Sequence, residues 1–152
     1  MKTFLLITLF SLVVGGSIYT GTRSRAGSLE WSKVKYFDVK EFDCPGIPLS
    51  GYEMDKDFIF KLDAAREIAQ VPFQISSGYR TPSYNRSVGG VAESPHILGY
   101  AADIKVTSSQ DRLKIIDALL KSGFVRIGIY KSHIHVDNDP DKPQDLIFHG
   151  EY

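Results

Sequence analysis

Cysteine is almost absent from this sequence, and its scarcity excludes two kinds of site. Cys44 is the single cysteine, so the chain cannot form an internal disulfide. A zinc site built on paired cysteines is excluded for the same reason. Cys44 is followed by Pro45 and Gly46, and we expect it to pack as a small apolar side chain in a turn.

An excess of charge of one sign is also lacking. Lysine and arginine together number 18, and so do aspartate and glutamate. Domains that bind nucleic acid usually carry a basic excess, so we expect no nucleic-acid partner. Repeats and low-complexity tracts are missing as well, and with 43% hydrophobic and 24% charged residues the composition is typical of a globular protein. The length fits one compact domain with a short extra segment.

Long apolar runs are confined to the N-terminus. The run at residues 4–19 follows the positive Lys2 and contains small residues near its end, a pattern typical of a signal peptide. Its length approaches the ~20 residues that span a bilayer, so an uncleaved anchor is an alternative. A buried core helix fits less well, because the run offers no polar face. We therefore predict a signal peptide or membrane anchor over residues 1–20, with membrane attachment through residues 4–19.

The segment after this run is polar and predicts a linker over residues 21–34, followed by one domain over residues 35–152. We expect an extracytoplasmic protein, periplasmic or secreted, which the N-terminal segment would hold at the inner membrane if it is not cleaved. Arg23 and Arg25 weaken this expectation, because they place positive charge after the run rather than before it. The alternative is a cytoplasmic protein with an atypical start.

The domain is predicted to be a small α+β unit, with two helices packed on one side of a small antiparallel sheet. Apolar residues recur at helical spacing in two stretches: Phe58, Leu62, Ala65 and Ala69 in the first, and Leu113, Ile116, Leu119 and Leu120 in the second. Ser108 and Asp111 stand at capping-box spacing, and Gly123 is placed to end the second helix. We expect helices at 55–70 and 108–121, strands at 73–76, 100–106, 125–130 and 133–137, and a long loop at 78–90.

Two of the predicted strands carry polar residues on one face. Ala102 and Ile104 alternate with Asp103 in the first, and Ile134 and Val136 alternate with His133, His135 and Asp137 in the second. Side chains alternate along a strand with period two, so the apolar sets face the core and the polar sets face away from it. His96 lies on the loop before the first strand, with Gly99 allowing a tight turn between them.

If the two strands are neighbours, Asp103 faces a histidine across the sheet at about 5 Å, which suits ligands that converge on one ion. Two histidine nitrogens and one carboxylate oxygen would leave a fourth tetrahedral position open, as in catalytic zinc sites. The set His96, Asp103, His133 and His135 therefore predicts a zinc site on the sheet face. His149, the fourth histidine, stands alone near the C-terminus and is read as an ordinary surface or core residue.

At these residues the sequence resembles the D-alanyl-D-alanine carboxypeptidase family of zinc metallopeptidases. This group also includes vancomycin-resistance dipeptidases, phage endolysins and the hedgehog signalling domain. Its pattern, S-x-H-x-x-G-x-A-x-D followed later by H-x-H, is matched by Ser94, His96, Gly99, Ala101, Asp103, His133 and His135. A third match runs from Ser77 to Pro82, with Tyr84 and Asn85 soon after, and the resemblance extends from about Lys35 to Asp137.

The resemblance implies a role for each matched residue. His96, Asp103 and His135 would bind zinc, the expected Zn²⁺ cofactor, and His133 would be the catalytic histidine beside it. Arg80 would bind a carboxylate of the substrate, and its alternative is a surface ion pair. Ser94 would touch the substrate or hold its loop.

The sequence departs from the family pattern at one position. Many members have an acidic general base three residues before the last histidine ligand, and Ser132 stands there instead. The departure shifts the expected proton transfer onto His133. Asp137 would either orient His135 through a hydrogen bond or simply sit at the end of its strand.

The expected function is zinc-dependent hydrolysis of peptide bonds in the stems of bacterial peptidoglycan, carried out by a monomer. A D-Ala-D-Ala carboxypeptidase and a related endopeptidase would share this metal site, so the sequence leaves the bond that is cut open. The alternative is a non-catalytic zinc-bearing binding module, as the resemblance to the hedgehog domain allows.

Overall fold

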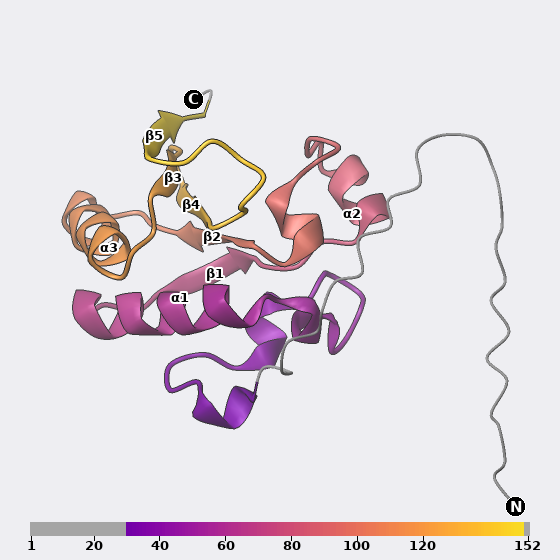
Figure 1. The fold of residues 1–152 in the computed structure, drawn as a ribbon, viewed down its shortest axis with the longest axis horizontal. Coiled ribbons are helices and arrows are strands. Elements are labelled where there is room, and N and C mark those ends of the chain that lie inside the picture. The colour runs from indigo at the N-terminus through magenta and orange to yellow at the C-terminus, as the bar shows by residue number, and fades with distance from the viewer. Residues whose placement is uncertain (1–29, 151–152) are drawn as a thin grey trace, which may run out of the picture.

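The computed structural model describes residues 30–150 (Figure 1). Its regular elements are α1 (Lys56–Ala69), α2 (Pro82–Ser87), α3 (Ser109–Lys121), and the strands β1 (Gln74–Ser77), β2 (Ala101–Lys105), β3 (Arg126–Ile129), β4 (His133–Asp137) and β5 (Leu146–His149). Four short 3-10 helices accompany them: η1 (Trp31–Lys33), η2 (Val39–Phe42), η3 (Ser50–Glu53) and η4 (Pro95–Leu98).

The five strands form one sheet in the order β1-β2-β4-β3-β5. The first three pairings in this order are antiparallel, whereas β5 pairs parallel to β3. The α+β class and the antiparallel centre of the sheet are confirmed, but β5 was not predicted. It is a four-residue strand that follows an irregular stretch, and only its partner β3 gives it a defined edge to pair with.

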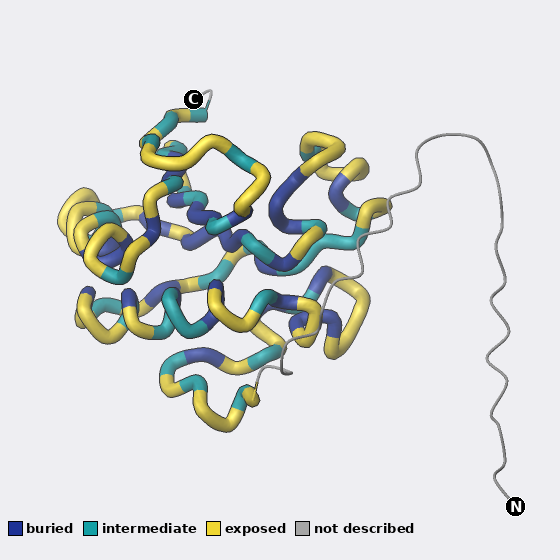
Figure 2. Tube along the Cα trace, viewed as in Figure 1, coloured by how far each residue is buried: buried dark blue, intermediate teal, exposed yellow. Residues whose placement is uncertain are grey.

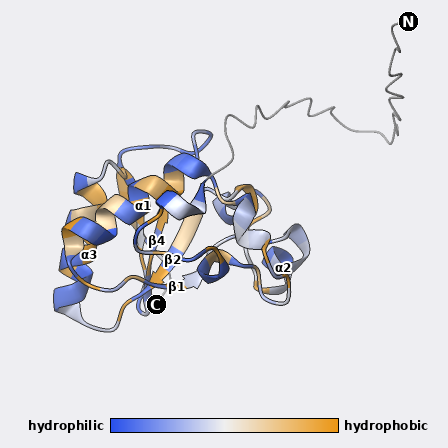
Figure 3. Cartoon of the chain, turned by 90° about the horizontal axis from the view of Figure 1, so that it is seen from below, coloured by the Kyte–Doolittle hydropathy of each residue, from blue (hydrophilic) through white to orange (hydrophobic). Residues whose placement is uncertain are grey.

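Helices α1 and α3 cover one face of the sheet, as predicted. In Figure 1, α1 lies on the lower side of β1 and β2, whereas α2 and the loop that joins β4 to β5 lie on the upper side. Seen from below in Figure 3, α1 and α3 lie beside each other and α2 lies apart from them. Figure 2 shows buried stretches along the strands and along the helices that pack on them, and a further buried stretch above the sheet in the segment that leads into β2.

Helix α1 forms where the sequence predicts it. The Asp55 side chain accepts a hydrogen bond from the Phe58 backbone N–H and begins the helix, and Gln70 ends it in the left-handed conformation. The predicted apolar stripe is buried against the sheet and includes Phe58 and Leu62, neither of which is exposed to solvent.

Helix α3 also has the predicted ends, but its predicted apolar stripe is wrong at two positions. The Ser108 side chain caps it by accepting from the Asp111 N–H. Leu113 is 71% exposed and Leu120 is 47% exposed, whereas Ile115 and Ala118 are buried. Both sets have helical spacing, so periodicity alone cannot choose between them. The small Ala118 lets α3 approach its neighbours, and the helix turns that side inward.

The predicted loop at residues 78–90 contains the helix α2, which is a correction to the sequence analysis. Thr81 caps α2 by accepting a hydrogen bond from the Tyr84 N–H, and Pro82 occupies the first turn, where it is tolerated best. The buried Asn85 then donates from Nδ2 to the Val91 carbonyl at 2.8 Å. These contacts give the segment before His96 a defined shape.

The predicted signal peptide or anchor, residues 1–20, lies outside the described residues. Of the predicted linker, residues 30–34 are described, and within them Trp31 and Val34 pack against the hydrophobic core. Within residues 30–150, no helix has the length and apolar character needed to cross a bilayer.

Candidate metal centre

The centre is built on one row of residues that crosses the sheet. Asp103 of β2 pairs directly with His135 of β4. The same row continues to Ser77 of β1 on one side and to Gly128 of β3 on the other. Because strand neighbours on one face lie within reach of each other, this register brings a carboxylate and an imidazole together from positions 32 residues apart in the sequence.

Alternation along the two strands decides which face these side chains occupy. Ala102, Ile104, Ile134 and Val136 are fully buried in the core beneath α1 and α3. Asp103 and His135 therefore point to the opposite face, where the side chain of Asp103 is 11% exposed and that of His135 is 13% exposed.

His96 reaches the same point from the short helix η4. Gly99 ends η4 with φ of 75°, and a Cβ at this position would collide with the Glu53 carbonyl. Only glycine adopts this positive φ without strain and also leaves room for the Glu53 carbonyl. His96 is 2% exposed, and its Nδ1 donates to the Gly78 carbonyl at 2.7 Å. Its Nε2 is thereby directed to Asp103, 3.3 Å from Oδ1.

His135 lies between two carboxylates. Its Nδ1 is 2.9 Å from Asp103 Oδ1, and its Nε2 is 3.0 Å from Asp137 Oδ2. Asp137 is fully buried, so it does more than sit at a strand end: it holds the far nitrogen of His135 and turns Nδ1 towards Asp103 and His96.

Burial and hydrogen bonding act in opposite directions on the pKa values of these groups. Burial would raise the pKa of Asp103, but its hydrogen bonds to His135 and His96 outweigh burial and hold that pKa well below its usual range. Burial lowers the pKa of His96, so its imidazole is neutral and its Nε2 can act as a ligand. Burial would also lower the pKa of His135, but hydrogen bonds to Asp103 and Asp137 raise it.

These three residues form the group of described side chains that could hold a metal ion, with ligand atoms that all lie within 4.8 Å of one another. Zinc bonds of about 2.0–2.1 Å place tetrahedral ligand atoms about 3.3 Å apart. The separations of Asp103 Oδ1 from His96 Nε2, 3.3 Å, and from His135 Nδ1, 2.9 Å, are close to that value. Two nitrogens and one carboxylate oxygen match a catalytic zinc site in chemistry, and the two separations from Asp103 fit its spacing.

Arg80 contacts the cluster through the carboxylate of Asp103. Its Nη2 donates to Asp103 Oδ2 at 2.6 Å, and its Nε donates to Ser77 Oγ at 2.8 Å. The Arg80 backbone N–H also donates to the His96 carbonyl at 3.1 Å. The side chain is 15% exposed. Arg80 thus makes an ion pair, but with the carboxylate of the centre and not at the outer surface.

His133 lies on the same sheet face, next to the cluster and not in it. It pairs with Lys105, two residues along the strands from the Asp103–His135 pair. Its ring stacks on the ring of Tyr130, with centroids 4.4 Å apart and planes 9° apart. Burial lowers the pKa of His133, so this histidine is neutral at neutral pH.

Ser94 and His149 occupy different surroundings. Ser94 is 4% exposed and precedes η4, where its side chain makes no capping hydrogen bond. This burial next to His96 suits the predicted role of holding the loop. His149 is exposed on the edge strand β5 and is not one of the residues grouped around a metal position.

Sequence reasoning missed three residues beside the centre: Arg126, Tyr130 and Phe148. Arg126 bonds Asp137, Tyr130 stacks on His133, and Phe148 lies 6.0 Å from His135 between ring centroids. Alternation with Gly128 could have placed Arg126 and Tyr130 on the polar face. Phe148 gave no such signal, because its strand was not predicted.

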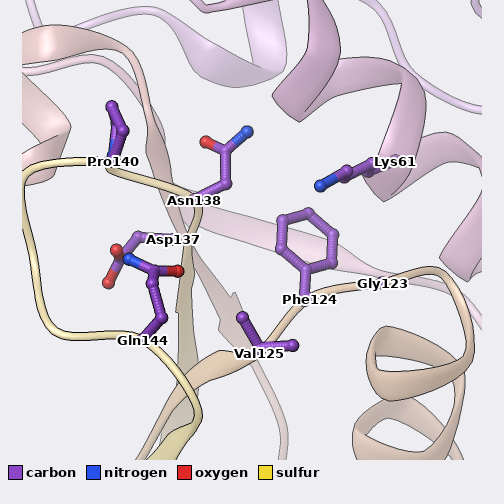
Figure 4. A pocket seen from close by; sticks show the side chains of 8 residues that line it. All are labelled: Lys61, Gly123, Phe124, Val125, Asp137, Asn138, Pro140 and Gln144. Carbon is purple, nitrogen blue, oxygen red and sulfur yellow. The ribbon is translucent and has the colours of Figure 1, made fainter.

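A cavity of about 350 Å³ lies beside the centre (Figure 4). Asp137 and Asn138 line it together with Lys61 of α1 and Phe124. His96, Asp103 and His135 do not line it, so this cavity is separate from the polar face where a substrate would meet the ligands.

Comparison with known proteins gives one family. A family model described as Peptidase M15 matches residues 39–137, a stretch that contains Arg80, His133 and all three residues of the cluster. No curated protein matches the chain.

Proposed function

Because the chain belongs to the M15 family of zinc peptidases, we propose that it hydrolyses peptide bonds in the stems of bacterial peptidoglycan, as a D-Ala-D-Ala carboxypeptidase or a related endopeptidase. The observation that carries the proposal is the convergence of His96, Asp103 and His135 on one point of the polar sheet face. Three protein ligands leave one tetrahedral position for water or substrate.

His96, Asp103 and His135 are the proposed zinc ligands, through Nε2, Oδ1 and Nδ1. A zinc ion held there would supply a Lewis acid for the scissile carbonyl and a nucleophilic water at neutral pH. The neighbours of the ligands fix them in place: the Gly78 carbonyl holds His96, Arg80 holds Asp103 and Asp137 holds His135. Such support keeps ligands oriented for catalysis.

His133 is the proposed group for proton transfer. It lies two residues from His135 on the same strand face, so the two Cα atoms are about 6.6 Å apart. Its Nδ1 lies 3.3 Å from Ser132 Oγ, which would leave Nε2 for the water or the leaving amine. A neutral imidazole accepts a proton at neutral pH, and acid–base help of this kind contributes roughly 10²–10⁴-fold.

Arg80 is the proposed residue for binding the substrate's carboxylate, and Ser94 is proposed to touch the substrate or to hold its loop. The contacts of Arg80 with Ser77 and Asp103 use Nε and Nη2, so a carboxylate of the peptide would be met by Nη1. In this proposal one guanidinium holds the ligand Asp103 and the substrate together, as the planar fork of arginine allows. Ser94 would act mainly by holding the loop that carries His96.

Digestion of purified peptidoglycan tests the activity and identifies the bond. We expect the zinc-loaded protein to release stem fragments that mass spectrometry can identify, with D-alanine for a carboxypeptidase and cut stems or cross-links for an endopeptidase. The His135→Ala protein should release none of them. A zinc-loaded protein that leaves peptidoglycan and its stem peptides intact would refute the proposal.

One observation favours the second candidate, a non-catalytic zinc-bearing binding module. Ser132 stands where many relatives have an acidic base, and its hydroxyl cannot take that role at neutral pH. If the protein binds stem peptides with zinc in place but turns none over, this module is the better description.

We also propose an extracytoplasmic location. The sequence of residues 4–19 supports export or attachment to the inner membrane, and the proposed substrate lies outside the cytoplasm. Cell fractionation tests this, and recovery of the native protein only in the cytoplasm would refute it. The domain is proposed to act as a monomer, which size-exclusion chromatography with light scattering would check.

A further inference from the structure

A chain of polar contacts runs from the centre through the buried Asp137 to Arg126 of β3. His135 Nε2 and Arg126 Nε both lie 3.0 Å from the same oxygen, Asp137 Oδ2. Arg126 extends the chain, because its Nη1 donates to the Pro143 carbonyl at 2.9 Å in the loop after β4.

Asp137 is fully buried, and burying a carboxylate is costly unless a charged partner compensates for the lost water. The Arg126 side chain is 17% exposed and supplies that charge. The other oxygen, Oδ1, accepts a hydrogen bond from the Asp139 backbone N–H at 3.3 Å. Both oxygens of Asp137 are therefore held by groups other than His135 as well.

Strand β5 also contacts the Arg126 side chain, through the ring of Phe148. The guanidinium lies 5.0 Å from the ring centroid of Phe148, within the range of a cation–π contact. The Phe148 ring can lie there because Gly128 has no side chain: a Cβ on Gly128 would be 2.7 Å from Phe148 Cε2. Residues 146–149 lie beyond the stretch matched by the family model, residues 39–137.

From this geometry we propose that Arg126 is a positioning residue of the metal centre. It holds the side chain of Asp137 in place, and Asp137 fixes the ring of His135 with Nδ1 towards Asp103 and His96. The C-terminal strand, through Phe148, is then part of the support of the centre. This inference rests on the proposed zinc site, but it concerns metal affinity and not the reaction.

The test measures zinc affinity by competition with a chelator in the full chain carrying Arg126→Met. We expect the Kd for zinc to rise by about 10–100-fold, as is usual when a residue that orients a ligand is lost. Arg66→Met is the matched control. Arg66 also lies over a phenylalanine, 4.8 Å from Phe37, and also donates to a carbonyl, that of Tyr36 at 2.6 Å, but it touches no residue of the centre. Its loss should lower the melting temperature and leave the zinc Kd unchanged.

A double-mutant cycle separates positioning from general stability. If Arg126 acts through Asp137, Arg126→Met should add little to the zinc Kd of an Asp137→Asn protein. The reason is that both changes remove the same support of the His135 ring, so their effects are not additive. Equal effects of Arg126→Met with and without Asp137→Asn would overturn the inference, and so would a zinc Kd within twofold of wild type. If Arg126→Met does not fold, Arg126→Gln is judged by the same criteria. A wild-type protein that binds no zinc refutes the proposed site itself, whereas wild-type affinity in the Arg126 variants refutes only this inference.

Discussion

Arg80 Nη2 lies 2.6 Å from Asp103 Oδ2, on the oxygen opposite the one that faces the two histidines. The two oxygens of Asp103 are thus divided between a positive partner and the metal position. An arginine placed in this way neutralises the carboxylate and also fixes its rotation. Arg80 therefore belongs to the support of the metal centre as well as to the proposed substrate site, and its variants should report on both.

Arg80→Lys should weaken both substrate binding and zinc binding. A lysine carries the charge but cannot bond Ser77, Asp103 and a substrate carboxylate with one planar group. We expect a raised KM for stem peptides and a measurably higher Kd for zinc. Arg86→Lys is the control, because Arg86 is exposed on α2 in the same segment. If Arg80→Lys has the kinetics and zinc affinity of wild type, Arg80 has neither role.

Loss of the metal should destabilise the folded domain. Zinc that binds the native state at 100 times its Kd stabilises that state by about 2.7 kcal/mol. Chelation should lower the melting temperature of the wild-type protein. The same treatment should have little effect on His96→Ala, Asp103→Ala and His135→Ala, which are expected to carry no zinc. Full zinc content in any of these three variants, measured by elemental analysis, would remove that residue from the ligand set.

Alanine variants of His133 and His135 should differ in zinc content, melting temperature and turnover. His133→Ala is expected to keep its zinc and the melting-temperature gain from zinc while losing most of its turnover. His135→Ala is expected to lose zinc and turnover together. Zinc content, melting temperature and turnover should be measured on both variants. Loss of zinc from His133→Ala with retention by His135→Ala would reverse the roles, and full activity in His133→Ala would place the proton transfer elsewhere.

Gly128 should be intolerant of even one added carbon. In Gly128→Ala the new Cβ would meet the Phe148 ring at 2.7 Å and Tyr130 Cε2 at 3.0 Å. We expect a loss of about 1–3 kcal/mol of folding stability, as is typical of overpacking. Urea unfolding measures this loss, and the double variant Gly128→Ala/Phe148→Leu should recover part of it, because leucine withdraws the ring atoms. No recovery would mean that the strain lies in the backbone.

The sequence by itself determined the local pattern of this protein. Alternation in the stretches around Asp103 and His135 predicted which side chains face the core, because period two follows from the geometry of any strand. Apolar spacing and capping residues placed α1 and α3 for equally local reasons. The order of His96, Asp103 and the H-x-H pair was enough to predict a metal site and the family.

The tertiary structure decided what depends on pairing between distant segments. Periodicity could not choose which side of α3 turns inward, because Ile115 and Leu113 both fit a helical stripe and only packing against neighbours separates them. Nor could it show that Arg80 holds Asp103, or that Arg126 reaches Asp137. The first contact joins the segment after β1 to β2, and the second depends on the register between β3 and β4. A shift of one residue in that register would turn each side chain to the other face. The strand β5 illustrates the same limit: Leu146–His149 becomes a strand because β3 offers an edge to pair with.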